Sequence, residues 1–273
     1  MSMVKFVAFD VDGTLRDRSY MPDSTREAVR RLRQAGVELA LCTGRSEYEI
    51  AGLREELGID WAITCNGAHV AYQGSTVFGT AFDDARVQRW LETSRSARHS
   101  LLLYGSQGMY WSGEDDSYFR RAQQEIGFLE PLPLHEEPQL PAVYQAIVFC
   151  TEAEERAYTA VSGGASGTDA TDATDAKGGS LYTHRWRPWA VDLNPQGVHK
   201  AAGLALLLEH LGVRREETAA FGDGLNDLEL LSSVGIGIAM GNGCDELKAV
   251  ATHVTKPLAE DGIAYAVERW LLR

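Results

Sequence analysis

A short apolar run, Phe6 to Phe9, ends abruptly in the sequence Asp10-Val11-Asp12-Gly13-Thr14. An uninterrupted apolar run is typical of a strand that is buried on both faces of a parallel sheet. Because side chains alternate along a strand, Asp10 and Asp12 can lean to the same side where the strand ends. Two carboxylates 4 Å apart repel each other by about 4 kcal/mol at an effective dielectric constant near 20. The pattern therefore favours a hard divalent cation at this point, since a cation offsets the repulsion.

Strand and helix patterns alternate on both sides of a long interval in the middle of the chain. Before the interval, strands are expected at 37–42 and 61–65, and helices at 24–35 and 47–57. After it, a helix is expected at 198–211, strands at 218–221 and 236–240, and a last helix at 263–272. This alternation predicts an α/β fold with a doubly wound, Rossmann-like parallel sheet.

The interval itself has a different rhythm. Helical patterns at 85–97 and 116–126 are mixed with strand-like runs at 101–104 and 144–150, which predicts an inserted α+β cap domain. The expected core domain is therefore discontinuous, 1–82 and 191–273, and the cap covers 83–190. Within the cap, residues 162–180 include tandem Thr-Asp-Ala triplets with little apolar surface, so a mobile low-complexity loop is expected there.

Composition limits the possible partners of the chain. It has 273 residues and a net charge of −13, and this acidic balance argues against a nucleic-acid-binding surface. A local site can still attract an anion, because its charge can oppose the global one. No apolar stretch reaches transmembrane length, and the N-terminus shows no signal-peptide pattern. A cytoplasmic protein without nucleic-acid or membrane partners is expected; the oligomeric state stays open.

Polar residues follow four of the predicted strands, and a lysine begins a helix. In open parallel sheets, ligands bind beyond the carboxyl ends of the strands, and a helix N-terminus there favours an anion. The residues expected at this edge are Asp10, Asp12, Thr43, Gly44, Arg45, Asn66, Lys200, Asp223, Asn226 and Asp227. Carboxylates beside a lysine and a threonine suit a phosphoryl group held next to a magnesium ion.

The segments Asp10–Leu15, Thr43–Arg45, Lys200 and Gly222–Asp227 resemble, in the same order, the four motifs of the haloacid dehalogenase superfamily. Asn66-Gly67-Ala68 and Asp261–Ala264 are similar to segments of its Cof-type phosphatase branch. An insertion between the second and third motifs resembles the C2-capped, type IIB members. As a set, these motifs are specific; a single lysine or Thr-Gly-Arg would not be.

The resemblance implies a role for each matched residue. Asp10 would be the nucleophile, and Asp12 the general acid/base. Thr43, Gly44 and Lys200 would hold the phosphoryl group, and Asn226 would either contact it or orient Lys200. Asp10, Asp12 through its backbone carbonyl, Asp223 and Asp227 would hold or support Mg²⁺. Arg45 is either a substrate contact or a structural ion pair, and Asn66 is either a substrate contact or a plain turn.

The function that follows is a Mg²⁺-dependent phosphomonoesterase working through an aspartyl-phosphate. Its expected substrates are small phosphorylated metabolites: sugar phosphates, or phosphorylated cofactors such as pyridoxal phosphate or FMN. A phosphomutase or phosphotransferase would share the same core and the same first step. A non-catalytic regulatory protein with the same fold predicts substitutions at the catalytic positions, yet Asp10, Asp12, Lys200 and Asp223 are intact.

Overall fold

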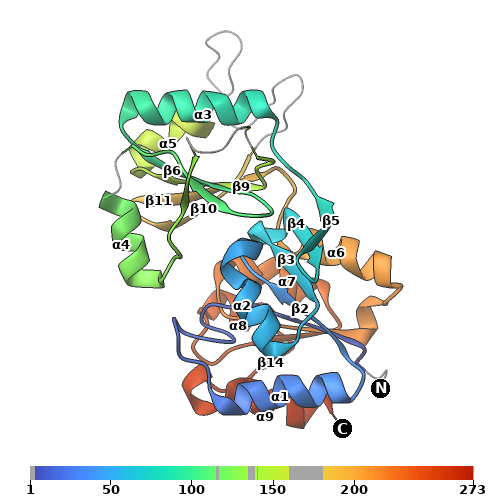
Figure 1. The fold of residues 1–273 in the computed structure, drawn as a ribbon. Coiled ribbons are helices and arrows are strands. Elements are labelled where there is room, and N and C mark those ends of the chain that lie inside the picture. The colour runs from blue at the N-terminus through green and yellow to red at the C-terminus, as the bar shows by residue number, and fades with distance from the viewer. Residues whose placement is uncertain (1–3, 115–116, 135–138, 140, 160–180, 273) are drawn as a thin grey trace. The chain divides into compact units, whose positions relative to one another are not determined.

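The computed structural model describes residues 4–114, 117–134, 139, 141–159 and 181–272, and the predicted loop at 162–180 lies outside them (Figure 1). The chain forms two compact units. The first unit combines Met1–Phe78 with His199–Arg273, and the second is Gly79–Val198. A unit assembled from two distant segments, with the other inserted between them, is the arrangement expected for an inserted cap.

The first unit is built on one large, mainly parallel sheet. Among the described residues, its strand order is β14-β13-β12-β1-β2-β3-β4-β5. Neighbouring strands from β14 to β3 run parallel, and β4 is antiparallel to β3. The strands are β1 Phe6–Phe9, β2 Glu38–Cys42, β3 Trp61–Thr64, β4 His69–Tyr72, β5 Ser75–Gly79, β12 Thr218–Gly222, β13 Ile236–Ala239 and β14 His253–Val254. The predicted α/β class and doubly wound sheet are confirmed.

Helices cover both faces of this sheet. Val7 and Phe9 of β1 face one apolar core, which includes side chains from α1, α2 and α9. Phe6 and Ala8 face the opposite core, built with α6, α7 and α8. The helices are α1 Asp23–Gln34, α2 Glu47–Leu57, α6 Lys200–Leu211, α7 Leu228–Ser233, α8 Asp245–Val250 and α9 Gly262–Ala266. Since both faces are buried, the strands are apolar at nearly every position, as a parallel sheet requires.

The second unit has its own sheet and its own core. Its strands are β6 Ser100–Tyr104, β7 Met109–Trp111, β8 Leu132–Pro133, β9 Gln145–Phe149, β10 Leu181–Arg187 and β11 Ala190–Pro195, in the order β10-β11-β9-β6-β7-β8. The pairs from β10 to β7 are antiparallel. Its helices are α3 Asp84–Ala97, α4 Ser117–Ile126 and α5 Glu152–Thr159. Trp90 of α3 and Tyr158 of α5 are buried in one apolar core with this sheet.

The borders of the units differ from the sequence-based prediction at both ends. The sequence pattern predicts residues 191–195 in the core domain, but they form β11, which pairs with β9 and β10 of the second unit. Val191 and Leu193 pack into that unit's core. Their alternation with Asp192 and Asn194 is the pattern of an antiparallel strand rather than a parallel one. The sequence pattern likewise predicts Phe82 in the core domain, but Phe82 packs in the second unit.

Two strands at one end of the first unit's sheet were not predicted from the sequence. β4 and β5 extend the sheet beyond β3, and they are connected through Gln73 and Gly74, both with positive φ angles. β5 forms an edge, and much of it is exposed to solvent. Its sequence, Ser75 to Gly79, has only two adjacent apolar residues, Val77 and Phe78, instead of the longer apolar run that predicts a buried strand.

Within the described residues, no helix has the length and apolar character needed to cross a membrane.

A close contact between α6 and the end of β3 sets the position of the third motif. A Cβ atom at Gly203 would lie 2.8 Å from the Cα atom of Gly67 and 2.8 Å from a methyl carbon of Ile63. Gly203 therefore allows α6 to approach the turn after β3, and Lys200 sits one turn before it. In contrast, a Cβ atom at Gly52 in α2 would meet nothing within 4 Å.

These two helical glycines should respond in opposite ways to alanine. Alanine is favoured over glycine inside a helix by about 1 kcal/mol, so Gly52→Ala should stabilise the protein by roughly that amount. Gly203→Ala gains the same helix propensity, but its methyl group overpacks the contact between α6 and the turn after β3, which costs about 1–3 kcal/mol of stability. A net destabilisation of about 1 kcal/mol is expected from denaturant unfolding. Equal stabilisation by both substitutions would contradict the packing argument.

Candidate active site

The parallel register brings the ends of distant strands together. β1 lies between β2 and β12, and Phe9 is in register with both Leu41 and Phe221. The backbone N–H of Asp10 donates to the carbonyl of Phe221 at 3.0 Å. As a result, the segments after β1 and β12, more than 200 residues apart in sequence, emerge side by side.

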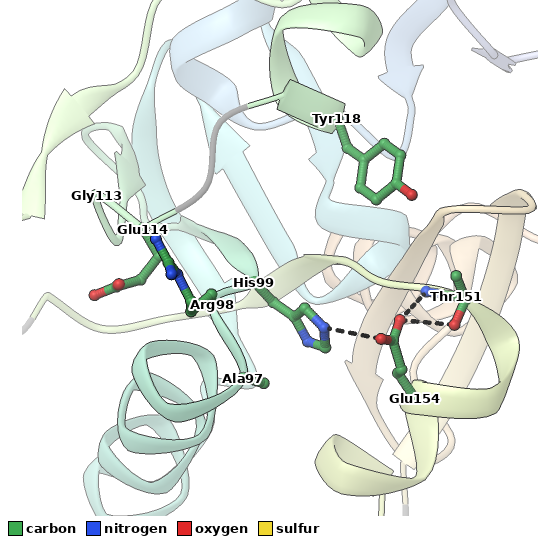
Figure 2. A pocket seen from close by; sticks show the side chains of 8 residues that line it. All are labelled: Ala97, Arg98, His99, Gly113, Glu114, Tyr118, Thr151 and Glu154. Carbon is green, nitrogen blue, oxygen red and sulfur yellow. Dashed lines mark hydrogen bonds and ion pairs between the residues drawn. The ribbon is translucent and has the colours of Figure 1, made fainter.

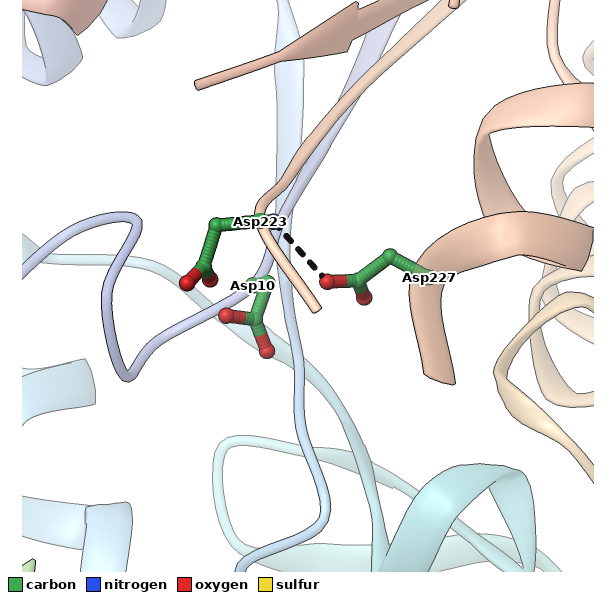
Figure 3. Close-up of side chains that lie close together, drawn as sticks. All are labelled: Asp10, Asp223 and Asp227. Carbon is green, nitrogen blue, oxygen red and sulfur yellow. Dashed lines mark hydrogen bonds between the residues drawn. The ribbon is translucent and has the colours of Figure 1, made fainter. Parts of the chain in front are cut away.

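Three carboxylates converge at this edge of the sheet. One oxygen each from Asp10, Asp223 and Asp227 lies within 4.8 Å of the others (Figure 3). In the part of the chain that the structure describes, no other group of His, Cys, Asp or Glu side chains is arranged in this way. Burial raises the pKa of Asp10 well above its usual value; the charge of Lys200 opposes this rise, and the charges of Asp227 and Asp223 add to it. Burial, followed by the charge of Asp227, raises the pKa of Asp223 to about 6.

Lys200 supplies a buried positive charge beside two of these carboxylates. Its Nζ lies 2.6 Å from Oδ1 of Asp10 and 2.7 Å from Oδ1 of Asp227. Burial alone would lower the pKa of Lys200, but the charges of Asp10 and Asp227 reverse this and hold it above the ordinary value. The ammonium group is thus charged, and it sits at the start of α6, where the helix dipole also favours an anion.

Asp227 has structural contacts as well as a place in the acidic cluster. Its Oδ2 accepts the backbone N–H groups of Asp223 at 3.0 Å and Gly224 at 3.1 Å, while its Oδ1 accepts from Lys200. These bonds fold the loop after β12 around the carboxylate. Asp227, rather than Asn226, therefore makes the hydrogen bond that orients Lys200.

The donor set at this site fits a hard cation. One lysine faces three carboxylates, so negative charge remains in excess, and carboxylate oxygens are the ligands that Mg²⁺ prefers. Asp223 is held in place because Thr14 Oγ1 donates to its Oδ1 at 3.0 Å. Gly13 makes room for it: a Cβ atom there would lie 2.2 Å from Asp223 Oδ2, and its φ angle is +87°. The glycine of the first motif is thus needed for the approach of the fourth.

Asp12 lies apart from the acidic trio and contacts Arg45. Nη2 of Arg45 lies 2.9 Å from Oδ1 of Asp12, and Nε contacts Oδ2, so the pair is bidentate. Nη1 of Arg45 also lies 3.2 Å from Oε1 of Glu49. Of the two alternatives left open for Arg45, the structure shows the ion pair.

The remaining predicted residues surround the same edge. The Thr43 side chain is buried, and its Oγ1 accepts the backbone N–H of Arg45 at 3.2 Å. Asn66 has a φ angle of 52°, and its Oδ1 accepts from Nδ2 of Asn226 at 3.2 Å. A Cβ atom at Gly44 would lie 3.1 Å from the Asn66 amide, so the loops after β2, β3 and β12 are in close contact. Asn66 is therefore more than an isolated turn residue.

Sequence reasoning missed Glu49 as a member of this network. Two signals could have found it: Glu49 follows Arg45 at helical spacing of four, and Ser46-x-x-Glu49 is a capping-box pattern. Thr14 was part of the quoted motif, but its contact with Asp223 could not be read from sequence.

The second unit contains a hollow of about 710 Å³, which Figure 2 shows with the eight residues that line it. Its central polar groups bond one another. Glu154 Oε2 accepts from the N–H and hydroxyl of Thr151 at the start of α5, and His99 Nε2 lies 3.5 Å from Glu154 Oε1. These contacts stabilise a helix end, so the hollow lacks the reactive arrangement seen in the first unit.

Known proteins are similar to this chain over nearly its whole length. Residues 7–267 match the family model of haloacid dehalogenase-like hydrolases. The chain is 32% identical to "Putative phosphatase YkrA" of Bacillus subtilis (strain 168), covering 97% of this chain and 96% of that protein. It is 26% identical to "5-amino-6-(5-phospho-D-ribitylamino)uracil phosphatase YcsE" of the same organism, covering 98% and 96%.

Among solved structures, the HAD subclass IIB sugar phosphatase BT4131 superposes with a TM-score of 0.77. Its sequence is 25% identical, and the superposition covers 98% of this chain and 99% of that one. The chain therefore belongs to the haloacid dehalogenase-like hydrolases, its reported relatives carry phosphatase names, and its fold is similar to that of a subclass IIB phosphatase.

Proposed function

We propose that this phosphatase is a Mg²⁺-dependent phosphomonoesterase that hydrolyses small phosphorylated metabolites through an aspartyl-phosphate on Asp10. The observation that carries the proposal is the convergence of Asp10, Asp223, Asp227 and Lys200 at one edge of the sheet. This arrangement combines a carboxylate nucleophile, oxygen ligands for a cation and a buried positive charge.

Asp10 is suited to attack phosphorus. Its carboxylate is buried, so it is poorly solvated, and Lys200 keeps it oriented through a 2.6 Å contact. Attack by one carboxylate oxygen would form an acyl phosphate as the bond from phosphorus to the leaving oxygen breaks. Hydrolysis is thereby divided into two easier steps, formation and breakdown of the covalent intermediate.

The cation would be held by Asp10, Asp223 and the backbone carbonyl of Asp12, with Asp227 supporting the loop behind them. When bound, Mg²⁺ would neutralise charge on the phosphoryl oxygens. Asp227 already accepts three hydrogen bonds, so its principal contribution is to fix Asp223 and Lys200.

Phosphoryl transfer depends mainly on positioning and on neutralising the equatorial oxygens. Lys200 supplies the positive charge. Thr43 would supply a hydroxyl and Gly44 a backbone N–H at the end of β2, and Asn226 would contribute an amide from the loop after β12. Asp12 would protonate the leaving oxygen in the first half-reaction and accept a proton from the attacking water in the second.

The proposed substrates are sugar phosphates or phosphorylated cofactors such as pyridoxal phosphate or FMN. Two similar proteins support this class: BT4131 is described as a sugar phosphatase, and YcsE is named for a phosphorylated ribitylaminouracil. Orthophosphate release from a panel of such compounds tests the class. Release of an isomerised sugar phosphate in place of orthophosphate would indicate a mutase.

Asp10→Asn should abolish turnover by removing the attacking charge while keeping the side-chain volume. A loss of at least about a thousandfold in orthophosphate release is expected, since the covalent route is closed. Asp245→Asn is the matched control, because the Asp245 side chain is fully exposed, and it should retain wild-type activity. Near-normal turnover by Asp10→Asn would refute the assignment of the nucleophile.

Chelation by EDTA should silence the enzyme, and added Mg²⁺ should restore it. Binding can also be measured without catalysis, because a ligand present at a hundred times its Kd stabilises the folded state by about 2.7 kcal/mol. Mg²⁺ should therefore raise the melting temperature of the wild type but not of Asp223→Asn. Activity unaffected by EDTA, or an equal thermal shift in both proteins, would exclude the proposed cation site.

A further inference from the structure

We infer that Glu49 is a positioning residue for the general acid/base Asp12, acting through Arg45. The inference rests on the proposed function, and it assigns a role to a side chain that touches neither the acidic trio nor Lys200 in the contacts described above.

Arg45 holds both oxygens of the Asp12 carboxylate. Nη2 donates to Oδ1 at 2.9 Å and Nε donates to Oδ2, which fixes the plane of the carboxylate as well as its distance. The Asp12 side chain is 43% exposed, whereas the Arg45 side chain is only 8% exposed. A half-exposed carboxylate on a loop would otherwise sample several rotamers, so its orientation depends on the buried arginine.

Glu49 in turn holds Arg45. Its Oε1 accepts from Nη1 of Arg45 at 3.2 Å, and its Oε2 accepts both the backbone N–H and the hydroxyl of Ser46 at 3.0 Å. The side chain of Glu49 is completely buried. The Glu49 carboxylate therefore caps the first turn of α2 and also holds the Arg45 guanidinium. The orientation of Asp12 is thus fixed by a helix rather than by a loop.

The geometry favours this role over direct substrate binding by Arg45. Nε, Nη1 and Nη2 each donate to a carboxylate, and a phosphoryl group would have to compete with both Asp12 and Glu49.

A comparison of two leaving groups tests the inference. Alkoxide leaving groups need a proton from the general acid, whereas p-nitrophenolate leaves without one. We expect Glu49→Gln to lower kcat/KM for glycerol 2-phosphate about tenfold and for p-nitrophenyl phosphate less than about threefold, a part of the 10²–10⁴ available to general acid catalysis. The ratio of the two values, measured on one sample, is independent of the fraction of folded protein.

Asp12→Asn is the benchmark and should show the same selective loss, with a larger magnitude. Glu56→Gln is the matched control: Glu56 lies on the same helix, is half-exposed and pairs with Arg26, so the ratio should not change. Equal losses on both esters by Glu49→Gln, or a rise in KM alone, would overturn the positioning role. A wild-type protein that hydrolyses neither ester would instead refute the proposed function.

Discussion

The charge balance around Lys200 is the constraint on which the site depends. A buried ammonium group is costly unless it is paired, and here two carboxylates from different segments share it. Removing one partner of such a pair costs about 3–5 kcal/mol because it leaves an uncompensated buried charge. Asp10 and Asp227 therefore stabilise the lysine that serves the chemistry, and the third carboxylate, Asp223, leaves the negative excess that a cation would offset.

The sheet makes this balance possible. Parallel strands end at a common edge of the sheet. The register of Phe9 with Phe221 therefore brings Asp10 and Asp223 together, although the two residues are far apart in the sequence. Two close approaches complete the arrangement. Gly13 admits the Asp223 carboxylate, and Gly203 lets α6 carry Lys200 against the turn after β3. Both glycines are needed because a side chain at either position would prevent the close approach. They are therefore as much a part of the site as the charged residues.

A second network lies beside the first and has a different physical basis. Asp12, Arg45, Glu49 and Ser46 form a chain of hydrogen bonds that leads from a partly exposed carboxylate into the start of α2. The carboxylates of Asp10, Asp223 and Asp227 bring negative charge together beside Lys200, whereas the hydrogen bonds from Asp12 to Ser46 fix the orientation of Asp12. In the proposed two-step reaction, the first network would hold the nucleophile and the second would orient the acid/base.

The sequence by itself determined the fold class and the order of the four motifs, and it predicted the residues of the candidate site. This was possible because an apolar run is typical of a buried parallel strand, and the polar residue that follows it marks the edge of the sheet where ligands bind. The tertiary structure decided which residues pair. Arg45 contacts Asp12 and Glu49, Asp227 rather than Asn226 orients Lys200, and Asn226 contacts Asn66. It also decided that residues 191–195 complete the second unit's sheet. These side-chain contacts depend on strand register and on side-chain direction in segments that are far apart in the sequence. Neither property can be read from a local sequence pattern.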